Sequence, residues 1–307
     1  MDTVAVWLLG AIWGGVFLAM KLAVATLPPF TAALCRIGLA ALFLLPLVLP
    51  RQAGRAQLWT HAPQLLIMGL LNNTIPQALM AWSLGRIDSG LAAILNATMP
   101  PFTVLLAWGL PPRTRPTVLQ LGGIALGLGG VAVLVGPDAL RGLGSVVWGQ
   151  LAMVGVAFSY AAAAVYGRRL AGLSPLTAST GQLTGAALWL VPLALMTDHP
   201  WALHPSALSL AAVSAAALLG TALAYLLYFF ILSRGGPTRL SLVTYVSPVF
   251  AVGWGWLVLD ERLTWNAAGG LVLIAVAVLC VTGQAREAMA WLVRRINPTA
   301  KSSVEVG

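Results

Sequence analysis

Arg36 is a cation inside an otherwise apolar segment, and a charge in such a place could do chemistry. It follows Pro29 by seven residues, which is about 10 Å along a helix. An isolated positive charge at that depth indicates a functional site. The guanidinium could hold the carboxylate of a substrate. Alternatively, it could donate hydrogen bonds to carbonyls that a kinked neighbouring helix exposes.

A group of amides lies between residues 72 and 77. Asn73 and Gln77 are four residues apart and therefore share one helical face, with Pro76 between them. Buried amides cost free energy unless they find hydrogen-bond partners. A single amide would be explained by contacts between helices, but several amides beside a proline favour a face that lines a wet cavity. We therefore place Asn73 and Gln77 in a substrate site and expect a kink at Pro76.

Two further apolar segments carry prolines near their centres, Pro100 and Pro101 in one and Pro248 in the other. A proline inside a helix cannot donate to the carbonyl four residues earlier, so it kinks the helix and frees that carbonyl. The polar residues at the same depth extend the predicted site: Asn96, Thr98, Thr244 and Tyr245. The alternative is a pair of kinked packing helices whose polar residues bond their neighbours.

Composition defines the class of protein that must position these residues. Of 307 residues, 59% are hydrophobic and 8% are charged, whereas a soluble domain has about 25% charged residues. This excludes a soluble globule, a disordered chain and a nucleic-acid binder, despite the net charge of +9. Cys35 and Cys280 both lie in apolar runs and indicate neither a disulfide nor a metal site. We predict an all-α membrane protein without a cofactor or a bound metal.

Charges, prolines and glycines divide the chain into ten apolar segments, each long enough for a transmembrane helix. They are Val4–Val24, Phe30–Leu49, Pro63–Leu84, Ser89–Leu110, Val118–Val135, Ser145–Tyr166, Pro175–Met196, Ala207–Leu232, Leu240–Leu259 and Trp265–Thr282. With ten spans, twelve of the 17 basic residues fall on the side of the N-terminus and three on the other. An excess of Lys and Arg marks the cytoplasmic side, so both termini are expected there.

The two basic residues inside spans are Arg36 and Lys21, and Lys21 is near enough to the outer end of its span to reach the membrane surface. The expected location is the inner or plasma membrane. Residues 284–307 read as a basic amphipathic tail lying on the cytoplasmic leaflet.

The chain contains an internal duplication. Leu27–Leu49 and Leu173–Leu195 are identical at 11 of 23 positions, at an offset of 146, and an offset of 148 pairs Pro100 with Pro248. This predicts repeats at 1–137 and 145–283. Each repeat has five spans, an odd number, so the second enters the membrane from the opposite side. Inverted repeats are typical of secondary transporters, in which one half rocks against the other.

The duplication also pairs aromatic and polar residues. Trp13 corresponds to Tyr160, Gln77 to Tyr225, and Arg36 to Gln182. An aromatic residue inside a bundle usually packs, but a matched pair also fits two walls of a cavity. We therefore add Trp13, Tyr160 and Tyr225 to the predicted substrate site. Because Arg36 corresponds to a neutral amide, any anion site would be asymmetric between the two halves.

Two stretches, SGLAAILNATMPPFTVLLA (89–107) and LDERLTW (259–265), resemble the drug/metabolite transporter superfamily, EamA branch. The resemblance covers nearly the whole chain. It implies a ten-helix carrier of small metabolites, often an exporter of amino acids or related solutes, with the cavity between the third, fourth, eighth and ninth spans and parts of the first and sixth. One departure is that Glu261 corresponds to Arg113 in the first repeat, so we interpret Glu261 as a loop-capping charge.

The sequence therefore predicts a secondary transporter that exports a small metabolite, such as an amino acid or a related amphipathic solute, by alternating access. No acid or histidine lies in the middle of a predicted span, which favours uniport or exchange over proton coupling. One alternative is a membrane enzyme acting on lipid-like substrates, suggested by Asp198, His199 and His204. A passive pore is the other. The expected partners are the substrate and membrane lipid, with no nucleic acid, and a homodimer is left open.

Overall fold

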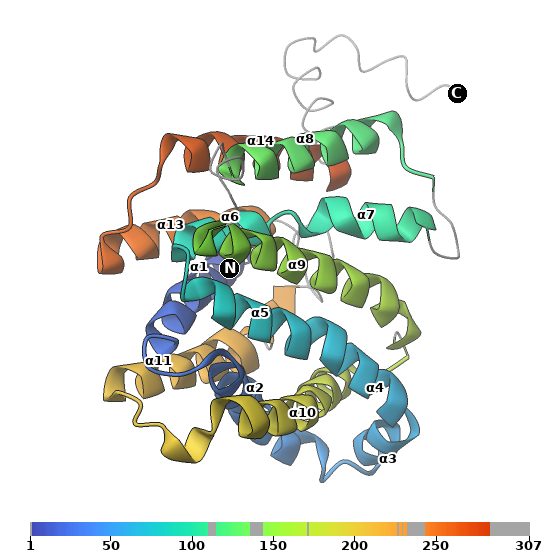
Figure 1. The fold of residues 1–307 in the computed structure, drawn as a ribbon. Coiled ribbons are helices and arrows are strands. Elements are labelled where there is room, and N and C mark those ends of the chain that lie inside the picture. The colour runs from blue at the N-terminus through green and yellow to red at the C-terminus, as the bar shows by residue number, and fades with distance from the viewer. Residues whose placement is uncertain are drawn as a thin grey trace, which may run out of the picture.

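The computed structural model describes residues 2–109, 115–135, 144–170, 172–225, 227–228, 230–231 and 243–282. Helices account for the regular structure of this part of the chain (Figure 1). Six helical stretches in it are long and apolar enough to cross a membrane. They are Val4–Ala23, Pro29–Val48, Ser89–Gly109, Ser145–Leu170, Pro175–Asp198 and Trp265–Thr282. Three shorter apolar helices accompany them: Val118–Leu134, Ala207–Leu223 and Val246–Leu259. The predicted tail at 284–307 lies outside the described residues.

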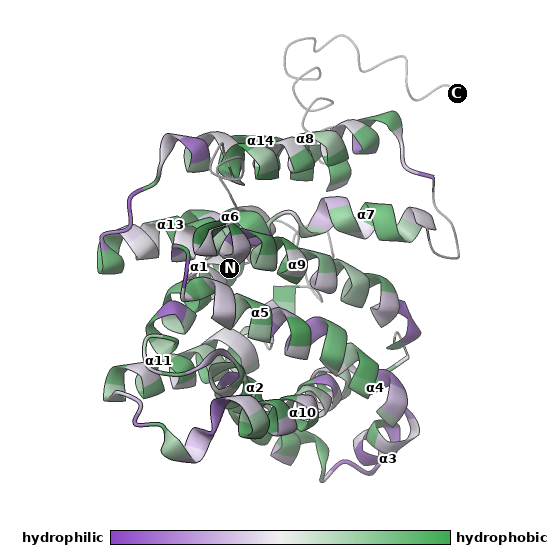
Figure 2. Cartoon of the chain, in the orientation of Figure 1, coloured by the Kyte–Doolittle hydropathy of each residue, from purple (hydrophilic) through white to green (hydrophobic). Residues whose placement is uncertain are grey.

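Each apolar segment predicted from the sequence contains a helix. The first half has α1 (Asp2–Ala23), α2 (Pro29–Val48), α3 (Gln52–Thr60), α4 (Ala62–Gly69), η1 (Leu70–Thr74), α5 (Ile75–Leu84), α6 (Ser89–Asn96), α7 (Met99–Gly109) and α8 (Val118–Val135). The second half has α9 (Ser145–Tyr166), η3 (Gly167–Leu170), α10 (Pro175–Leu193), η4 (Ala194–Asp198), η5 (Pro200–Ala202), α11 (Ala207–Ala217), η6 (Leu218–Leu223), α13 (Val243–Leu259) and α14 (Trp265–Thr282). Figure 2 shows mostly hydrophobic helices, with hydrophilic residues gathered on α3 and in the connections.

Two π-helical turns interrupt long helices in the described part of the chain, and a third, η4, ends α10. One is η1, between α4 and α5, and the other is η6, which follows α11. Their first residues, Leu70 and Leu218, differ by 148 positions, which is the offset that pairs Pro100 with Pro248. A π turn widens the helix by one residue and is frequent at functional sites. Pro76 lies in the first turn of α5, directly after η1.

The helix is broken in one of the two segments that carry central prolines. The helix stops at Asn96 and restarts at Met99, because neither Pro100 nor Pro101 can donate a backbone hydrogen bond. In contrast, α13 continues through Pro248 without a break. A bend of α13 at Pro248 stays a prediction. One proline removes a single bond from the hydrogen-bond ladder, whereas adjacent prolines remove two.

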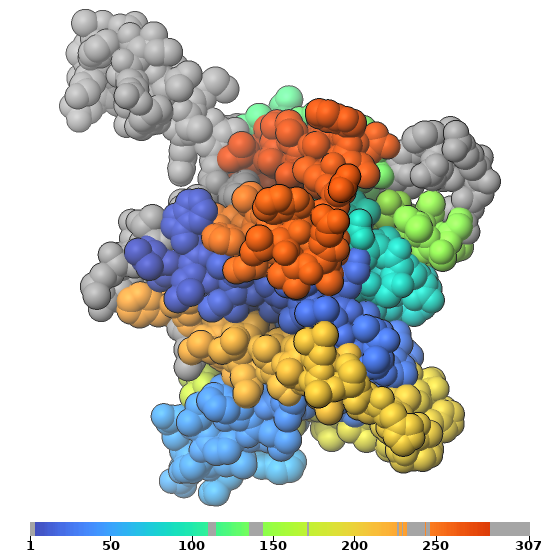
Figure 3. All heavy atoms as spheres, turned by 90° about the vertical axis from the view of Figure 1, so that its left-hand side faces the viewer, coloured from blue at the N-terminus to red at the C-terminus, as the bar shows by residue number. Residues whose placement is uncertain are grey.

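The two halves pack against each other along their length. Helix α1 lies against α13, α2 against α10, and α8 against α14, and the last pair forms one edge of the molecule in Figure 1. Close approach of α1 and α13 depends on Gly14, whose hydrogen faces the α13 backbone at Ser247 and Ala251. Figure 3 shows α1 between α13 and α11 on one face.

We call the end of the molecule where α1 ends and α2 begins the Lys21 end. Hydrogen bonds join several helix ends there. Asp198 Oδ2 accepts from the backbone N–H of Thr31 at 2.6 Å and from its hydroxyl at 3.0 Å, which caps the start of α2. Ser209, in the first turn of α11, donates to the carbonyl of Leu22 at 2.9 Å. These bonds connect the two halves at this end.

Candidate functional site

Arg36 lies at the centre of the candidate site. The residue is 7% exposed, and among the described residues its side chain makes two hydrogen bonds, both to neutral groups. Its Nη1 donates to Gln77 Oε1 at 2.6 Å, and its Nε donates to Thr221 Oγ1 at 3.3 Å. Thr221 can accept because its own hydroxyl donates to the carbonyl of Ala216. Helices α2 and α5 therefore meet the π turn η6 at this side chain.

Gln77 links Arg36 to Tyr160. A guanidinium can only donate, so the oxygen of the Gln77 amide must face Arg36 and its nitrogen must face the other way. That nitrogen donates to the Tyr160 hydroxyl at 3.0 Å. The Tyr160 oxygen is thus an acceptor, and its hydrogen remains available to donate. Within the described part of the chain, no acceptor for that hydrogen is found.

A second amide cluster forms around Gln182 of α10. Its Oε1 accepts from Asn72 Nδ2 at 2.8 Å and from Asn73 Nδ2 at 3.4 Å, and both of these residues lie in η1. Ser159 donates at 2.6 Å to the carbonyl of Leu71, in the same π turn. The cluster therefore mirrors the first one, because in each a residue of α2 or α10 reaches the π turn of the other half.

Tyr225 connects the two clusters. Its hydroxyl interacts with the side chain of Asn72 and is close enough to Arg36 for an electrostatic interaction. Its ring meets Tyr228 at a centroid distance of 6.5 Å, and Tyr228 meets Trp13 at 6.1 Å. Trp13 is therefore linked to the polar groups through the ring of Tyr228. It packs in an apolar cluster with residues of α1 and α13. We call the joined polar groups the Arg36 network: Arg36, Asn72, Asn73, Gln77, Tyr160, Gln182, Thr221 and Tyr225.

Two predicted residues, Thr98 and Asn96, lie outside this network. Thr98 donates to the carbonyl of Leu95 in its own chain segment, at 2.7 Å. Asn96 ends α6 beside the proline break, and its buried Oδ1 has no hydrogen-bond partner among the described residues. Thr244 and Tyr245 belong to α13, but their side chains lie outside the described part.

The predicted site omitted three members of the network: Asn72, Gln182 and Thr221. The duplication offers the signal for two of them, because Gln182 corresponds to Arg36 and Thr221 corresponds to Asn73. Asn72 precedes Asn73 in the sequence, but on a regular helix it would face elsewhere. The π turn brings both amides to Gln182.

The electrostatics of the network are unbalanced. Neither hydrogen bond of Arg36 goes to a carboxylate, and no carboxylate of the described residues lies within ion-pair distance of it. A guanidinium has five N–H donors, so the network holds more donors than acceptors. A buried charge without a counter-charge is costly in a membrane interior. An anionic ligand would supply both the missing charge and the missing acceptors.

Comparison with known proteins identifies the family. The model of the EamA-like transporter family matches residues 3–136 and, a second time, residues 147–283. The chain belongs to this family. The uncharacterized transporter sll0355 of Synechocystis is 28% identical, covering 82% of this chain and 81% of its own. The uncharacterized inner membrane transporter YedA of Escherichia coli K12 is also 28% identical, covering 89% of each chain.

A third relative, the uncharacterized transporter YoaV of Bacillus subtilis, is 26% identical over 88% of this chain and 93% of its own. A solved crystal structure shares the fold, with a TM-score of 0.64 at 20% identity over 93% of this chain and 98% of that one. Together with the apolar helices, these relatives make the EamA-like protein a multi-pass membrane transporter.

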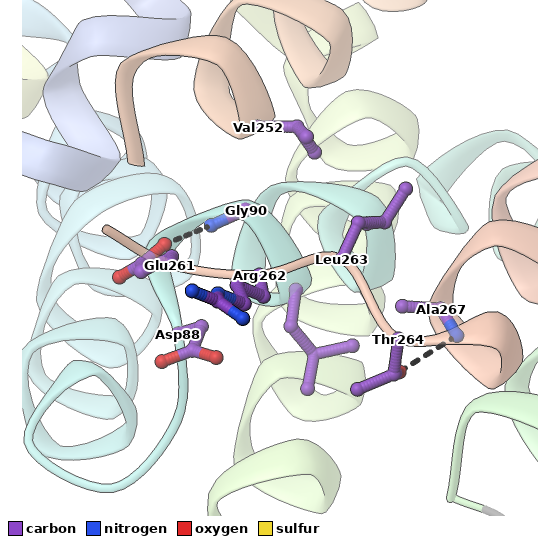
Figure 4. A pocket seen from close by; sticks show the side chains of 9 residues that line it. Asp88, Gly90, Val252, Glu261, Arg262, Leu263, Thr264 and Ala267 are labelled. Carbon is purple, nitrogen blue, oxygen red and sulfur yellow. Dashed lines mark hydrogen bonds between the residues drawn. The ribbon is translucent and has the colours of Figure 1, made fainter. Parts of the chain in front are cut away.

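A separate ionic cluster lies at the Lys21 end of the transporter. Lys21 Nζ donates to Glu261 Oε1 at 2.7 Å, to Asp88 Oδ1 at 3.0 Å and to the carbonyl of Ile87 at 3.2 Å. Lys21 was expected to reach the membrane surface, but it is held by acids 67 and 240 residues away in the sequence. Figure 4 shows Glu261 and Asp88 at one side of a pocket of about 60 Å³.

Glu261 also caps α6, which confirms the capping role expected for it. Its oxygens accept from the backbone N–H of Ser89 at 3.0 Å, from the Ser89 hydroxyl at 2.8 Å and from the N–H of Gly90 at 3.3 Å. Burial opposes ionisation of this carboxyl. The hydrogen bonds from Lys21 and Ser89 outweigh burial, so the pKa of Glu261 lies below its ordinary value of 4.5.

Acid is expected to weaken this cap. Because the pKa of Glu261 is lowered by folding, its contribution to stability is complete at neutral pH. That contribution is lost as the pH falls below 4.5 and through the lowered pKa of the folded state. Thermal unfolding of the parent and of Glu261→Gln between pH 7 and pH 3 measures this effect. The gap in Tm between the two should narrow toward pH 3, and a gap that stayed constant would contradict the assignment.

Proposed function

We propose that this EamA-like transporter exports a small metabolite that carries a carboxylate, such as an amino acid or a related amphipathic solute. The observation that carries the proposal is Arg36, which is buried and, among the described residues, bonded to neutral groups alone. A substrate carboxylate would pair with the guanidinium and accept from the Tyr160 hydroxyl as well. The aromatic rings of Tyr225, Tyr228 and Trp13 then offer an apolar side to the rest of the substrate.

The proposed mechanism is alternating access between two inverted repeats, at 1–137 and 145–283, with ten spans in the inner or plasma membrane and both termini in the cytoplasm. The double match of the family model supports two repeats. The two π turns at equivalent positions, each bonded to the opposite half, support a site between the repeats. The proposed direction of transport, export, rests on the resemblance to metabolite exporters alone. The geometry of the site does not indicate a direction.

The proposed driving force is the solute gradient, by uniport or exchange. Among the described residues, the Arg36 network contains no Asp, Glu or His that could carry a proton. A lipid-directed enzyme finds less support. Asp198, which such an enzyme would need beside His199 and His204, is engaged by Thr31 at the start of α2, and His199 stacks edge-on against Trp201.

Proteoliposomes test the proposal. Thermal-shift screening of purified protein first selects an amino acid that raises the Tm. Counterflow is then measured with that amino acid, with its carboxamide, and with the amine that lacks the carboxyl group. We expect saturable counterflow with the amino acid only. Equal rates for the carboxamide would contradict carboxylate recognition. Non-saturable flux would indicate a pore, and uptake that followed an imposed pH gradient would indicate proton coupling.

A further inference from the structure

We propose that Lys21, Asp88 and Glu261 form an ionic gate that holds the Lys21 end of the transporter closed, and that the duplication does not repeat these three residues at the corresponding positions of the opposite end. The resting protein would then favour the conformation that is open at the opposite end, which is the cytoplasmic end in the proposed topology. The inference rests on the alternating-access mechanism proposed above, but not on the identity of the substrate.

The cluster is built across the two halves of the chain. Lys21 comes from the end of α1, Asp88 from the turn between α5 and α6, and Glu261 from the connection between α13 and α14. Opening the molecule at this end would separate α1 from that turn and that connection. Such a motion must break the 2.7 Å and 3.0 Å ion pairs of Lys21. These ion pairs can therefore form only in the closed conformation.

The two sides of the gate differ in how firmly they are held. Both carboxylate oxygens of Glu261 are anchored by Ser89 and Gly90 at the start of α6, and its side chain is only 9% exposed. Lys21 is 25% exposed, and all its hydrogen bonds go to the opposite side of the gate. The lysine is thus the part that can leave, while Glu261 stays with α6.

The duplication does not repeat this set of residues at the corresponding positions of the opposite end. Position 168 corresponds to Lys21 at an offset of 147, and positions 236 and 113 correspond to Asp88 and Glu261 at an offset of 148. These positions hold Arg168, Gly236 and Arg113. The Lys21 end thus has one cation and two acids at these positions, whereas the corresponding positions hold two cations and a glycine. Like charges repel, so these three residue types do not form an attractive ionic set.

The variants Lys21→Met and Glu261→Gln remove the gate in two ways. Lys21→Met leaves the cap on α6 intact, because the bonds from Ser89 and Gly90 to Glu261 do not involve the lysine. Arg86→Met is the matched control. Arg86 is a cation of the same region, but its guanidinium stacks on Trp82 at 3.6 Å and donates to the carbonyl of that residue, so in the described part of the chain its charged group bonds within the first half.

Distances between spin labels report directly whether the Lys21 end is open or closed. With Cys35 and Cys280 replaced by serine, labels are placed at exposed positions, Trp201 with Trp265 at the Lys21 end and Trp59 with Val118 as a second pair. We expect both gate variants to increase severalfold the population with a long 201–265 distance. The Arg86→Met distribution should match the parent. Distances that stay unchanged in Lys21→Met, whatever its Tm, would overturn the proposal and leave the cluster a structural staple.

The same experiment separates this inference from the proposed function. Spin-label distances need no substrate. If the gate variants shift the population while no carboxylate binds, the gate stands and the proposed substrate class fails. If a carboxylate binds and is transported but the distances of Lys21→Met equal those of the parent, the substrate class stands and the gate fails.

Discussion

Replacement of Arg36 by methionine is expected to lower saturable transport of a carboxylate substrate at least about 100-fold, without lowering the stability of the protein. Hydrogen bonds to charged groups contribute about 1.5–3 kcal/mol each, and a 100-fold loss of affinity corresponds to about 2.7 kcal/mol. A carboxylate that pairs with the guanidinium would lose at least that much. Counterflow in proteoliposomes measures the transport, and thermal unfolding in detergent measures the stability.

The stability half of this prediction distinguishes a substrate site from a structural ion pair. Removing one member of a buried ion pair destabilises a protein, because the partner charge is left alone. Arg36 has no such partner among the described residues, so its removal leaves only two neutral acceptors, Gln77 and Thr221, without a donor. We expect a Tm close to that of the parent. A sharp fall in Tm would show instead that Arg36 holds the fold together.

A second variant, Arg36→Gln, separates the charge from the hydrogen bonds. Glutamine is the residue that the second half carries at the corresponding position, Gln182, where it meets the π turn of the first half. It can still donate to Gln77 or Thr221 but has no charge. We expect it to be as inactive toward carboxylates as Arg36→Met. Recovery of most of the activity would show that the site recognises a neutral group. Arg86→Met, which removes an exposed arginine, serves as the control.

Much of the fold could be predicted, because the signal is the length of apolar runs. Helices α9 and α14 begin and end at the residues expected from the sequence, Ser145–Tyr166 and Trp265–Thr282. The π turns could not be predicted, since no residue type requires them. They are accompanied by tertiary hydrogen bonds, such as the one from the Ser159 hydroxyl to the carbonyl of Leu71.

The candidate site was predictable where a residue is much more polar than the sequence around it. A charge or an amide in an apolar run, such as Arg36 or Gln77, stands out by its cost of burial. Thr221 does not stand out, because a threonine can satisfy its hydroxyl within its own helix, as Thr221 does with Ala216. The role of Lys21 depends on Glu261, 240 residues away, and only the folded chain shows that pairing.

The crossing of α1 and α13 leads to the second large effect, expected for Gly14→Ala. A Cβ at this position would lie 2.7 Å from Phe250 Cβ and from Ser247 O, and 2.8 Å from Ala251 N. Two of these atoms are backbone, so no side-chain rotation can relieve the clash and the helices must separate. Overpacking of this kind costs about 1–3 kcal/mol. We expect the Tm to fall by several degrees, and further for Gly14→Val.

Gly15→Ala is the matched control, one residue along the same helix. The atom nearest to a Cβ at Gly15 is Trp254 Nε1, at 3.6 Å, an ordinary contact. Alanine also favours a helix over glycine by up to about 1 kcal/mol, so the Tm should stay level or rise. Thermal unfolding followed by tryptophan fluorescence compares the two variants. Equal melting of Gly14→Ala and Gly15→Ala would refute the close approach of α1 and α13. Because these helices come from different halves, the same clash should also slow transport, since any rocking of one half against the other must pass through this contact.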